Sequence, residues 1–170
     1  MRKYFNLTVI LLLSTQLYGG GSHINFALSG NKVNNSDYRA GAEFGVDMIK
    51  TFNNGFELGG ALDAGIFMVK EYQTTNDEGA RLVDFLVRAG YNFNNSFQIP
   101  FALRAGAGYA VGDIGTTSMK GYIYDIAGEY DFTTRYGVGV KYKKADLTLI
   151  LPNDPKIDYS QIGCYLTVKF

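Results

Sequence analysis

The sequence predicts an all-β protein, an eight-stranded antiparallel up-and-down transmembrane β-barrel. Three observations predict it: segments in which apolar and charged residues alternate, turn motifs at regular spacing, and an apolar alternating strand at the carboxyl end. The composition agrees, because 13 Tyr, 12 Phe and 21 Gly beside only 3 Pro favour strands over helices. A length of 170 residues suggests one domain.

The amino end has the outline of a secretory signal. Arg2 and Lys3 precede an apolar run over residues 7–13, and the small residues 19–22 follow. The run is too short to span a bilayer, since a membrane helix needs about 20 apolar residues. We therefore expect residues 1–21 to be a cleavable signal peptide and residues 22–170 to form a single barrel domain of an exported protein.

A turn motif recurs about every 40 residues. The segment Phe52-Asn53-Asn54-Gly55-Phe56 returns at 93–97 and, altered, at 132–136, and Asn and Gly suit tight hairpins. The strands expected between these turns cover 24–30, 38–52, 56–68, 83–93, 97–111, 122–132, 136–143 and 159–170. Longer connections are expected at 70–80, 112–120 and 144–158, with a shorter one near 32–37. Tight turns on one side and longer loops opposite are typical of outer-membrane barrels. Pro100 falls inside the fifth strand, where a bulge or a rim position is expected.

Charges keep to one face of each predicted strand. In the strand over 56–68, Leu58, Leu62 and Ile66 share a face, whereas Glu57 and Asp63 share the other. The other predicted strands show the same separation. A charge on a lipid-facing side costs about 2–4 kcal/mol at the bilayer midplane, which explains an apolar face free of charge. Lys50 has the apolar parity, but it lies close enough to Phe52 to snorkel toward the head groups.

A soluble β-sandwich would also separate apolar and charged faces, so two further features decide. Aromatic residues mark the ends of the tight turns, as in an interfacial girdle on the periplasmic side: Phe52, Phe56, Phe93, Phe97, Phe132 and Tyr136. Glycines are frequent on the charged face, where they would make room for long side chains in a narrow lumen. Both features favour the membrane barrel.

The charged face then lines the lumen, where buried charges must be paired. The residues expected to form this network are Glu43, Asp47, Asp63, Asp84, Arg88, Arg104, Asp125, Glu129, Lys141 and Lys143. Counted from the turn aromatics, Asp63, Arg104, Asp125 and Lys143 lie at one height. An eight-stranded interior is just filled by side chains, so we expect no open pore.

The residues give little support to other functions. A formal net charge of zero argues against a nucleic-acid partner. The single histidine, His23, lies beside the expected cleavage region, where a flanking role is expected, so a hydrolase triad has no base. Cys164 cannot form an intrachain disulfide, and a small apolar residue facing outward is its expected role. We expect no catalytic residue, cofactor or metal site, and no enzymatic activity.

The last strand alternates and ends on an aromatic residue: Ile162, Cys164, Leu166, Val168 and Phe170 share one face. This segment resembles the carboxyl-terminal recognition signal of bacterial outer-membrane barrels, with Ile162, Leu166, Val168 and Phe170 as the matching positions. The whole mature chain resembles the small eight-stranded barrels of the OmpA membrane-domain, OmpX/Ail-like and opacity-like porin group.

The resemblance implies an integral outer-membrane protein of a Gram-negative bacterium with a structural or surface-interaction role. Its implied partners are outer-membrane lipid, the barrel-insertion machinery and a surface ligand at the outer loops, and a monomer is expected. Two alternatives stay open from the residues. One is a soluble periplasmic lipid carrier of lipocalin type, whose apolar faces would turn inward, and the other is a narrow pore for small solutes.

Overall fold

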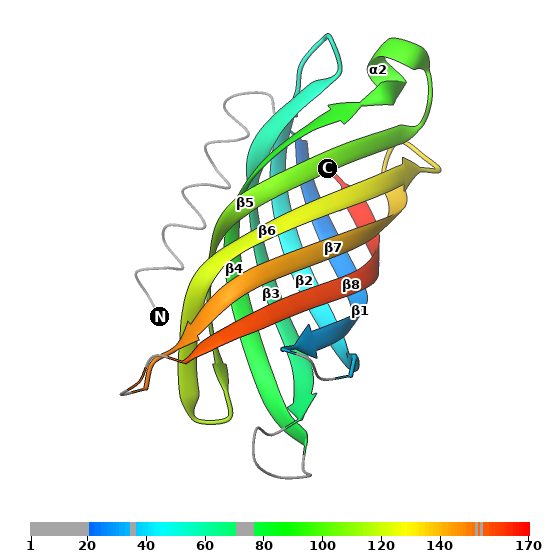
Figure 1. The fold of residues 1–170 in the computed structure, drawn as a ribbon. Helices are drawn as coiled ribbons and strands as arrows, with labels where there is room; N and C mark the ends of the chain where they lie inside the picture. Colours follow the sequence, from blue (N-terminus) through cyan, green and yellow to red (C-terminus); the bar gives the residue numbers. More distant parts are fainter. Residues whose placement is uncertain (1–20, 35–36, 71–76, 152, 154) are drawn as a thin grey trace.

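The chain folds into one closed antiparallel sheet, as the computed structural model shows for residues 21–170 except 35–36, 71–76, 152 and 154. Each strand pairs with its neighbours in sequence, and β8 pairs with β1 to close the barrel (Figure 1). The strands are β1 Gly21–Val33, β2 Arg39–Thr51, β3 Phe56–Lys70, β4 Asp77–Asn92, β5 Phe101–Ile114, β6 Thr117–Asp131, β7 Tyr136–Leu149 and β8 Lys156–Lys169. The predicted fold class is confirmed.

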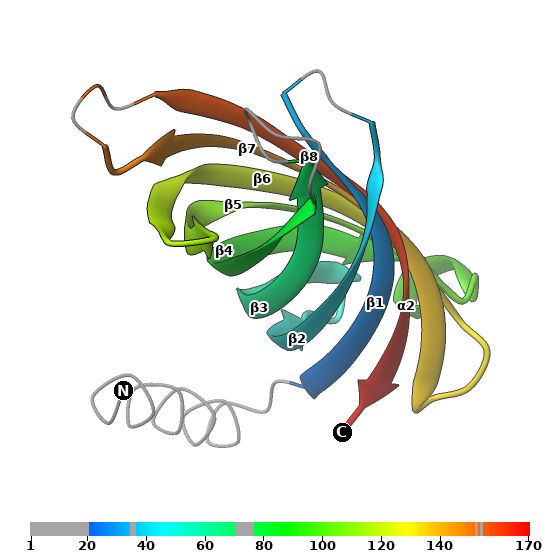
Figure 2. The same ribbon diagram turned by 90° about the horizontal axis from the view of Figure 1, so that it is seen from below.

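Seen from below, the strands curve round so that β8 lies beside β1 (Figure 2). The closing seam is in full register: Phe26 lies opposite Leu166 and Ser29 opposite Gly163. The Phe170 amide donates to the Ser22 carbonyl at 2.9 Å, so the seam continues to the last residue. No strand edge is left open, which is the condition for a sheet that spans a bilayer.

The tight turns share one end of the barrel, which we call the turn end; it carries connections 52–55, 93–100 and 132–135. Asn54 and Thr133 stabilise two of these turns through side-chain oxygens that accept backbone N–H bonds. Gly55 takes a positive φ of 83°, which its turn requires. We call the opposite end the outer end.

Two expectations about the connections were wrong. Residues 93–97 form a short helix, α2 Phe93–Phe97, so β5 starts at Phe101 and not at Phe97. Pro100 therefore precedes the strand, at the rim. The expected long connections 112–120 and 144–158 are mostly strand, because β5, β6, β7 and β8 all extend beyond their predicted ends.

The predicted apolar rows face outward on every strand. Along β7, Val138, Val140 and Tyr142 are exposed, whereas the alternate residues Lys141 and Lys143 are buried in the lumen. This orientation contradicts the lipocalin-type alternative, in which the same rows would line an internal cavity. Lys50 faces outward as well, with its ammonium 5.7 Å from the Phe52 ring centre.

Toward the outer end, the polarity of the wall reverses. On β7, the outward row changes after Tyr142 to Lys144 and Asp146, and the inward row changes after Lys143 to Ala145 and Leu147. We call the reversed part, residues 79–82, 117–121, 144–149 and 156–160, the outer collar. Its inward side chains belong to one apolar cluster with members from the adjoining strands: Phe67, Val69, Leu82, Leu86, Met119, Ile123, Leu147, Ile157 and Tyr159.

Strand length explains why the barrel has two parts. The 14 residues of β7 extend about 47 Å at 3.4 Å per residue. A tilt of about 40° leaves a rise of roughly 35 Å, more than the apolar band of about 25 Å found in such barrels. The collar is the part of the barrel that extends beyond the apolar band. Like a water-soluble barrel, it has polar residues outside and apolar residues inside.

Within the described residues, no helix has the length and apolar character needed to cross a membrane. The expected signal peptide falls on residues outside the described part, apart from Gly21, which is the first residue of β1.

Candidate functional site

A network of buried ion pairs lies in the lumen between the turn end and the collar. At its centre is Arg88 of β4, whose guanidinium contacts three carboxylates from three other strands. It lies 2.5 Å from Asp47 on β2 and 2.9 Å from Asp63 on β3, and it binds Asp125 on β6 through two nitrogens. A guanidinium suits this position because its planar donors can serve several carboxylates at once.

Two lysines of β7 complete the centre from the opposite wall. The Lys143 ammonium, 0% exposed, lies 2.8 Å from Glu43, 2.6 Å from Asp63 and 2.8 Å from Asp84. Lys141 contacts Glu43 and also lies 3.3 Å from Asp63. Asp63 therefore joins both lysines to Arg88, and the pairs form one connected unit across the lumen.

A second group lies nearer the turn end, around Arg104 of β5. Its guanidinium lies 2.7 Å from Glu57 and 3.0 Å from Glu129. Lys169 of β8 continues the chain of charges with contacts at 2.8 Å to Glu129 and 2.5 Å to Asp131. The ion pairs thus extend from the middle of the barrel to its turn end.

Glycines on the inner wall create the room for these side chains. A Cβ at Gly45 would lie 2.0 Å from Asp63 Oδ1, and one at Gly106 would lie 2.3 Å from Asp125 Oδ1. Both separations are far below any allowed contact, so these carboxylates occupy space that only glycine leaves free. The predicted role of the lumen glycines agrees with this geometry.

Three of the carboxylates, Glu43, Asp63 and Asp84, have the mutual spacing of metal ligands. The Lys143 ammonium is hydrogen-bonded to all three. A protein cation thus already sits where these oxygens would hold a metal ion. The chemistry of this group is charge neutralisation within the wall.

All of the charged lumen residues named from the sequence are buried and ion-paired, but one lies at a different height. Arg104 was counted level with Asp63, Asp125 and Lys143, whereas it pairs with Glu57 and Glu129 closer to the turn end. The count began at Phe97, which belongs to α2. From the true start of β5 at Phe101, Arg104 is only three residues into the strand.

Sequence reasoning missed several interior residues. His23, expected to flank the barrel, is buried on the inward face of β1. The Tyr159 hydroxyl donates to Asn31 Oδ1 at 2.7 Å and lies 3.1 Å from Gln161 Oε1, so neutral polar groups lie where the collar meets the charged network. The collar had a signal in the sequence: after residue 143 the two faces of β7 exchange character.

The turn aromatics and the terminal strand lie on the outer surface. The aromatics pair within each turn, with ring centres 5.8 Å apart for Phe52 and Phe56 and 6.4 Å apart for Phe132 and Tyr136. Phe93 and Phe97 pair at 6.3 Å although they belong to α2. Ile162, Leu166 and Phe170 are exposed on the outward face of β8, and Val168 is half-buried there.

An apolar exterior around an ion-paired interior defines the class: the chain is an eight-stranded β-barrel of the outer-membrane type. No protein-family model and no curated protein matches the sequence. Solved structures with this fold include the neisserial surface protein A, with a TM-score of 0.60 at 13% identity over 89% of this chain and 97% of that one.

Ail, the attachment invasion locus protein of Yersinia pestis, is similar at a TM-score of 0.59 and 13% identity, over 89% of this chain and 99% of that one. Ail has also been solved with the heparin analogue sucrose octasulfate and in a phospholipid bilayer nanodisc. At these identities the likeness shows a shared fold.

Proposed function

We propose that the chain is an integral protein of a bacterial outer membrane, with a structural or surface-interaction role and a lumen closed to solutes by its ion pairs. The observation that carries the proposal is the single connected network around Arg88, Lys143 and Asp63, which joins buried side chains of β2, β3, β4, β6 and β7. An eight-stranded barrel is only wide enough for its own side chains.

Conductance in planar lipid bilayers tests the closed lumen. The expected result is the absence of large, stable current steps at neutral pH, and steps of that kind would establish the pore alternative. The buried carboxylates Glu43, Asp47, Glu57, Asp63, Asp84, Asp125 and Glu129 outnumber the buried cations Arg88, Arg104, Lys141 and Lys143. Any residual leak is therefore expected to select cations over anions.

Heat-modifiable migration on a gel tests membrane integration. A barrel closed by full strand pairing stays compact in mild detergent and unfolds on boiling, so two mobilities are expected. Extraction from membranes without detergent would contradict an integral position.

The outward row of β8 supports a role in biogenesis. At the carboxyl end of the chain, Ile162, Leu166 and Phe170 are exposed on the outward face, and Val168 is half-buried between them. We expect the insertion machinery to recognise this row, so Phe170→Asn should lower the yield of heat-modifiable barrel in cell envelopes. Leu28→Asn, on the outward face of β1, controls for the general cost of a polar residue in the band.

A surface ligand would meet the outer collar and its turns. Ail, which shares the fold, was solved with a heparin analogue, and the collar here displays Lys120, Lys144 and Lys156 among acidic residues. Sucrose octasulfate is therefore the first ligand to test, by calorimetry on the detergent-solubilised barrel at two salt concentrations. Binding that salt weakens would support a polyanion site, since such contacts are screened.

The same residues argue against an enzymatic role. The single imidazole, His23, is buried in the lumen close to Lys169 and Glu129. A hydrolytic site needs such a base beside an accessible nucleophile. The proposal is therefore non-enzymatic.

A further inference from the structure

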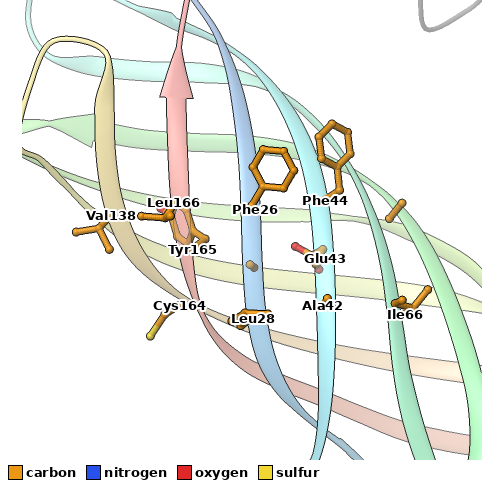
Figure 3. Close-up of a pocket in the computed structure, with 12 residues that line it drawn as sticks. Phe26, Leu28, Ala42, Glu43, Phe44, Ile66, Val138, Cys164, Tyr165 and Leu166 are labelled. Atoms are coloured by element: carbon orange, nitrogen blue, oxygen red, sulfur yellow. The ribbon is translucent and has the colours of Figure 1, made fainter.

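The lipid-facing wall is hollowed over the barrel seam. A groove of about 620 Å³ crosses the outer face of β7, β8, β1, β2 and β3, and its lining is almost entirely apolar. Figure 3 shows the rings of Phe26 and Phe44, in edge-to-face contact at 5.2 Å, at one end of it. Leu28, Ala42 and Cys164 continue the lining toward the outer end.

Beyond the groove, β1 and β2 continue toward the outer end with small outward residues. Leu28 lies opposite Ala42, and the next outward pair on the same two strands is Gly30 opposite Ala40. Beyond them on β1 comes Lys32. The ring of Tyr38 covers Gly30, with its nearest atom 3.4 Å from where a Cβ on that glycine would lie, so an aromatic ring lies between the groove and this lysine.

Two lysines lie beyond the groove, toward the outer end. Ser160 of β8 pairs with Lys144 on one side and with Lys32 on the other, so the three residues form one outward row. Adjacent strands lie about 4.8 Å apart, which places the two lysine backbones roughly 10 Å from each other. The Lys32 ammonium lies 5.9 Å from the centre of the Tyr38 ring, and among the described residues neither lysine forms an ion pair.

We propose that the groove and this lysine row bind one anionic membrane lipid, with an acyl chain in the groove and a phosphate head group between Lys32 and Lys144. The inference rests on the proposed membrane location. One row further out, Asp146 lies opposite Asp158. These two carboxylates would repel an anionic head group, which keeps the head group at the lysine row. Two lysines beside a phosphate contribute charge-assisted contacts that a zwitterionic head group offers more weakly.

Charge complementarity favours a lipid over a second copy of the chain. Two barrels in one membrane that met through this face would place residues of equal height against each other. The lysine row of one copy would then face the lysine row of the other, and the row of Asp146 and Asp158 would face the same row of the other copy, so neither row would meet its counter-charge. A phosphate supplies that counter-charge, and an acyl chain matches the narrow apolar groove.

Tryptophan fluorescence can test the site, because the chain contains no tryptophan. Ile66→Trp places a reporter on the edge of the groove, and Val87→Trp places a control on β4, facing lipid away from it. Each variant is reconstituted into phosphatidylcholine vesicles that contain either brominated phosphatidic acid or brominated phosphatidylcholine at the same mole fraction. Bromine quenches only the tryptophan that its acyl chain contacts.

The expected result is a relative association of phosphatidic acid over phosphatidylcholine of at least about fivefold at Ile66→Trp, the factor that one lysine near an anionic surface contributes. The ratio should be close to one at Val87→Trp. Adding Lys32→Gln and Lys144→Gln to Ile66→Trp should bring its ratio down to that of the control.

Equal quenching by both lipids at both positions would overturn the lipid site while leaving the barrel in the membrane. Weak quenching by both lipids at Ile66→Trp alone, as a second copy over the groove would cause, would overturn it too. The absence of quenching at both positions would refute the membrane location itself. A ratio unchanged by the lysine substitutions would show that the head-group assignment is wrong.

Discussion

Replacing Lys143 with methionine removes one charge and keeps a similar volume in a fully buried position. Lys143 makes ion pairs with Glu43, Asp63 and Asp84. Glu43 and Asp63 keep Lys141 as a partner, but Asp84 loses the single cation that the described structure gives it. Breaking a buried pair by removing one partner costs about 3–5 kcal/mol, because the remaining charge stays buried and uncompensated. We expect Lys143→Met to lower the free energy of unfolding by that amount.

Urea titration of the barrel in liposomes, followed by gel mobility, measures this difference. Lys141→Met is the matched control: it leaves Lys143 in contact with every carboxylate that Lys141 touches, so its cost should be clearly smaller. Adding Asp84→Asn to Lys143→Met should recover part of the lost stability, since it removes the orphaned charge. If Lys143→Met cost less than about 1 kcal/mol, the size of a solvated surface pair, or if Asp84→Asn deepened the loss, the reasoning would be refuted.

Three further outcomes are expected. Gly45→Ala should cost about 1–3 kcal/mol in the same urea titration, because its Cβ would fall 2.0 Å from Asp63 Oδ1 and displace that carboxylate; no change in midpoint would mean that the lumen has spare room. Val87→Lys should cost about 2–4 kcal/mol, whereas Ser118→Lys on the collar should cost almost nothing, and equal costs would contradict the position of the apolar band. Leu147→Ala should cost about 2–5 kcal/mol by opening a cavity in the collar core, and a neutral result would mean that this core is not packed.

The architecture can be predicted from the sequence because a membrane-spanning strand has two faces in different surroundings. One face meets lipid and the other faces the lumen. Alternation in the band therefore reports orientation directly, and the turn motifs at 52–56 and 132–136 fix the strand order. The second repeat led to a wrong prediction of a tight turn at 93–97. These residues share the aromatic ends of the first repeat but lack its glycine, and they form α2. That error shifted the count that placed Arg104.

The charged residues were found by type and face, but their partners were not. Asp125 and Lys143 are cross-strand neighbours in register, yet Asp125 binds Arg88, two strands away across β5, while Lys143 binds carboxylates on β2, β3 and β4. Long side chains cross a narrow lumen, so the tilt and stagger of the strands decide which charges meet. A linear count of residues does not contain that information.

The collar was missed for a different reason. The seventh strand is predicted to end at residue 143, one residue after the apolar row stops at Tyr142, so the reversed segment beyond it falls in a predicted connection. The strand continues beyond the apolar band into water, where its outward face is polar and its inward face apolar. Lys144 and Asp146 therefore face water, whereas Ala145 and Leu147 face the core.

A depth scan along the outward row of β7 tests most directly where lipid ends and water begins. Single cysteines at Val140, Tyr142, Lys144 and Asp146, in a Cys164→Ala background, would carry spin labels in phospholipid vesicles. Collision with oxygen, which concentrates in lipid, is expected to dominate at positions 140 and 142, and collision with a water-soluble nickel chelate is expected at 144 and 146. Nickel access at position 140, or oxygen dominance continuing through 146, would contradict the account, which places the apolar outward rows in hydrocarbon and the collar in water at the outer end.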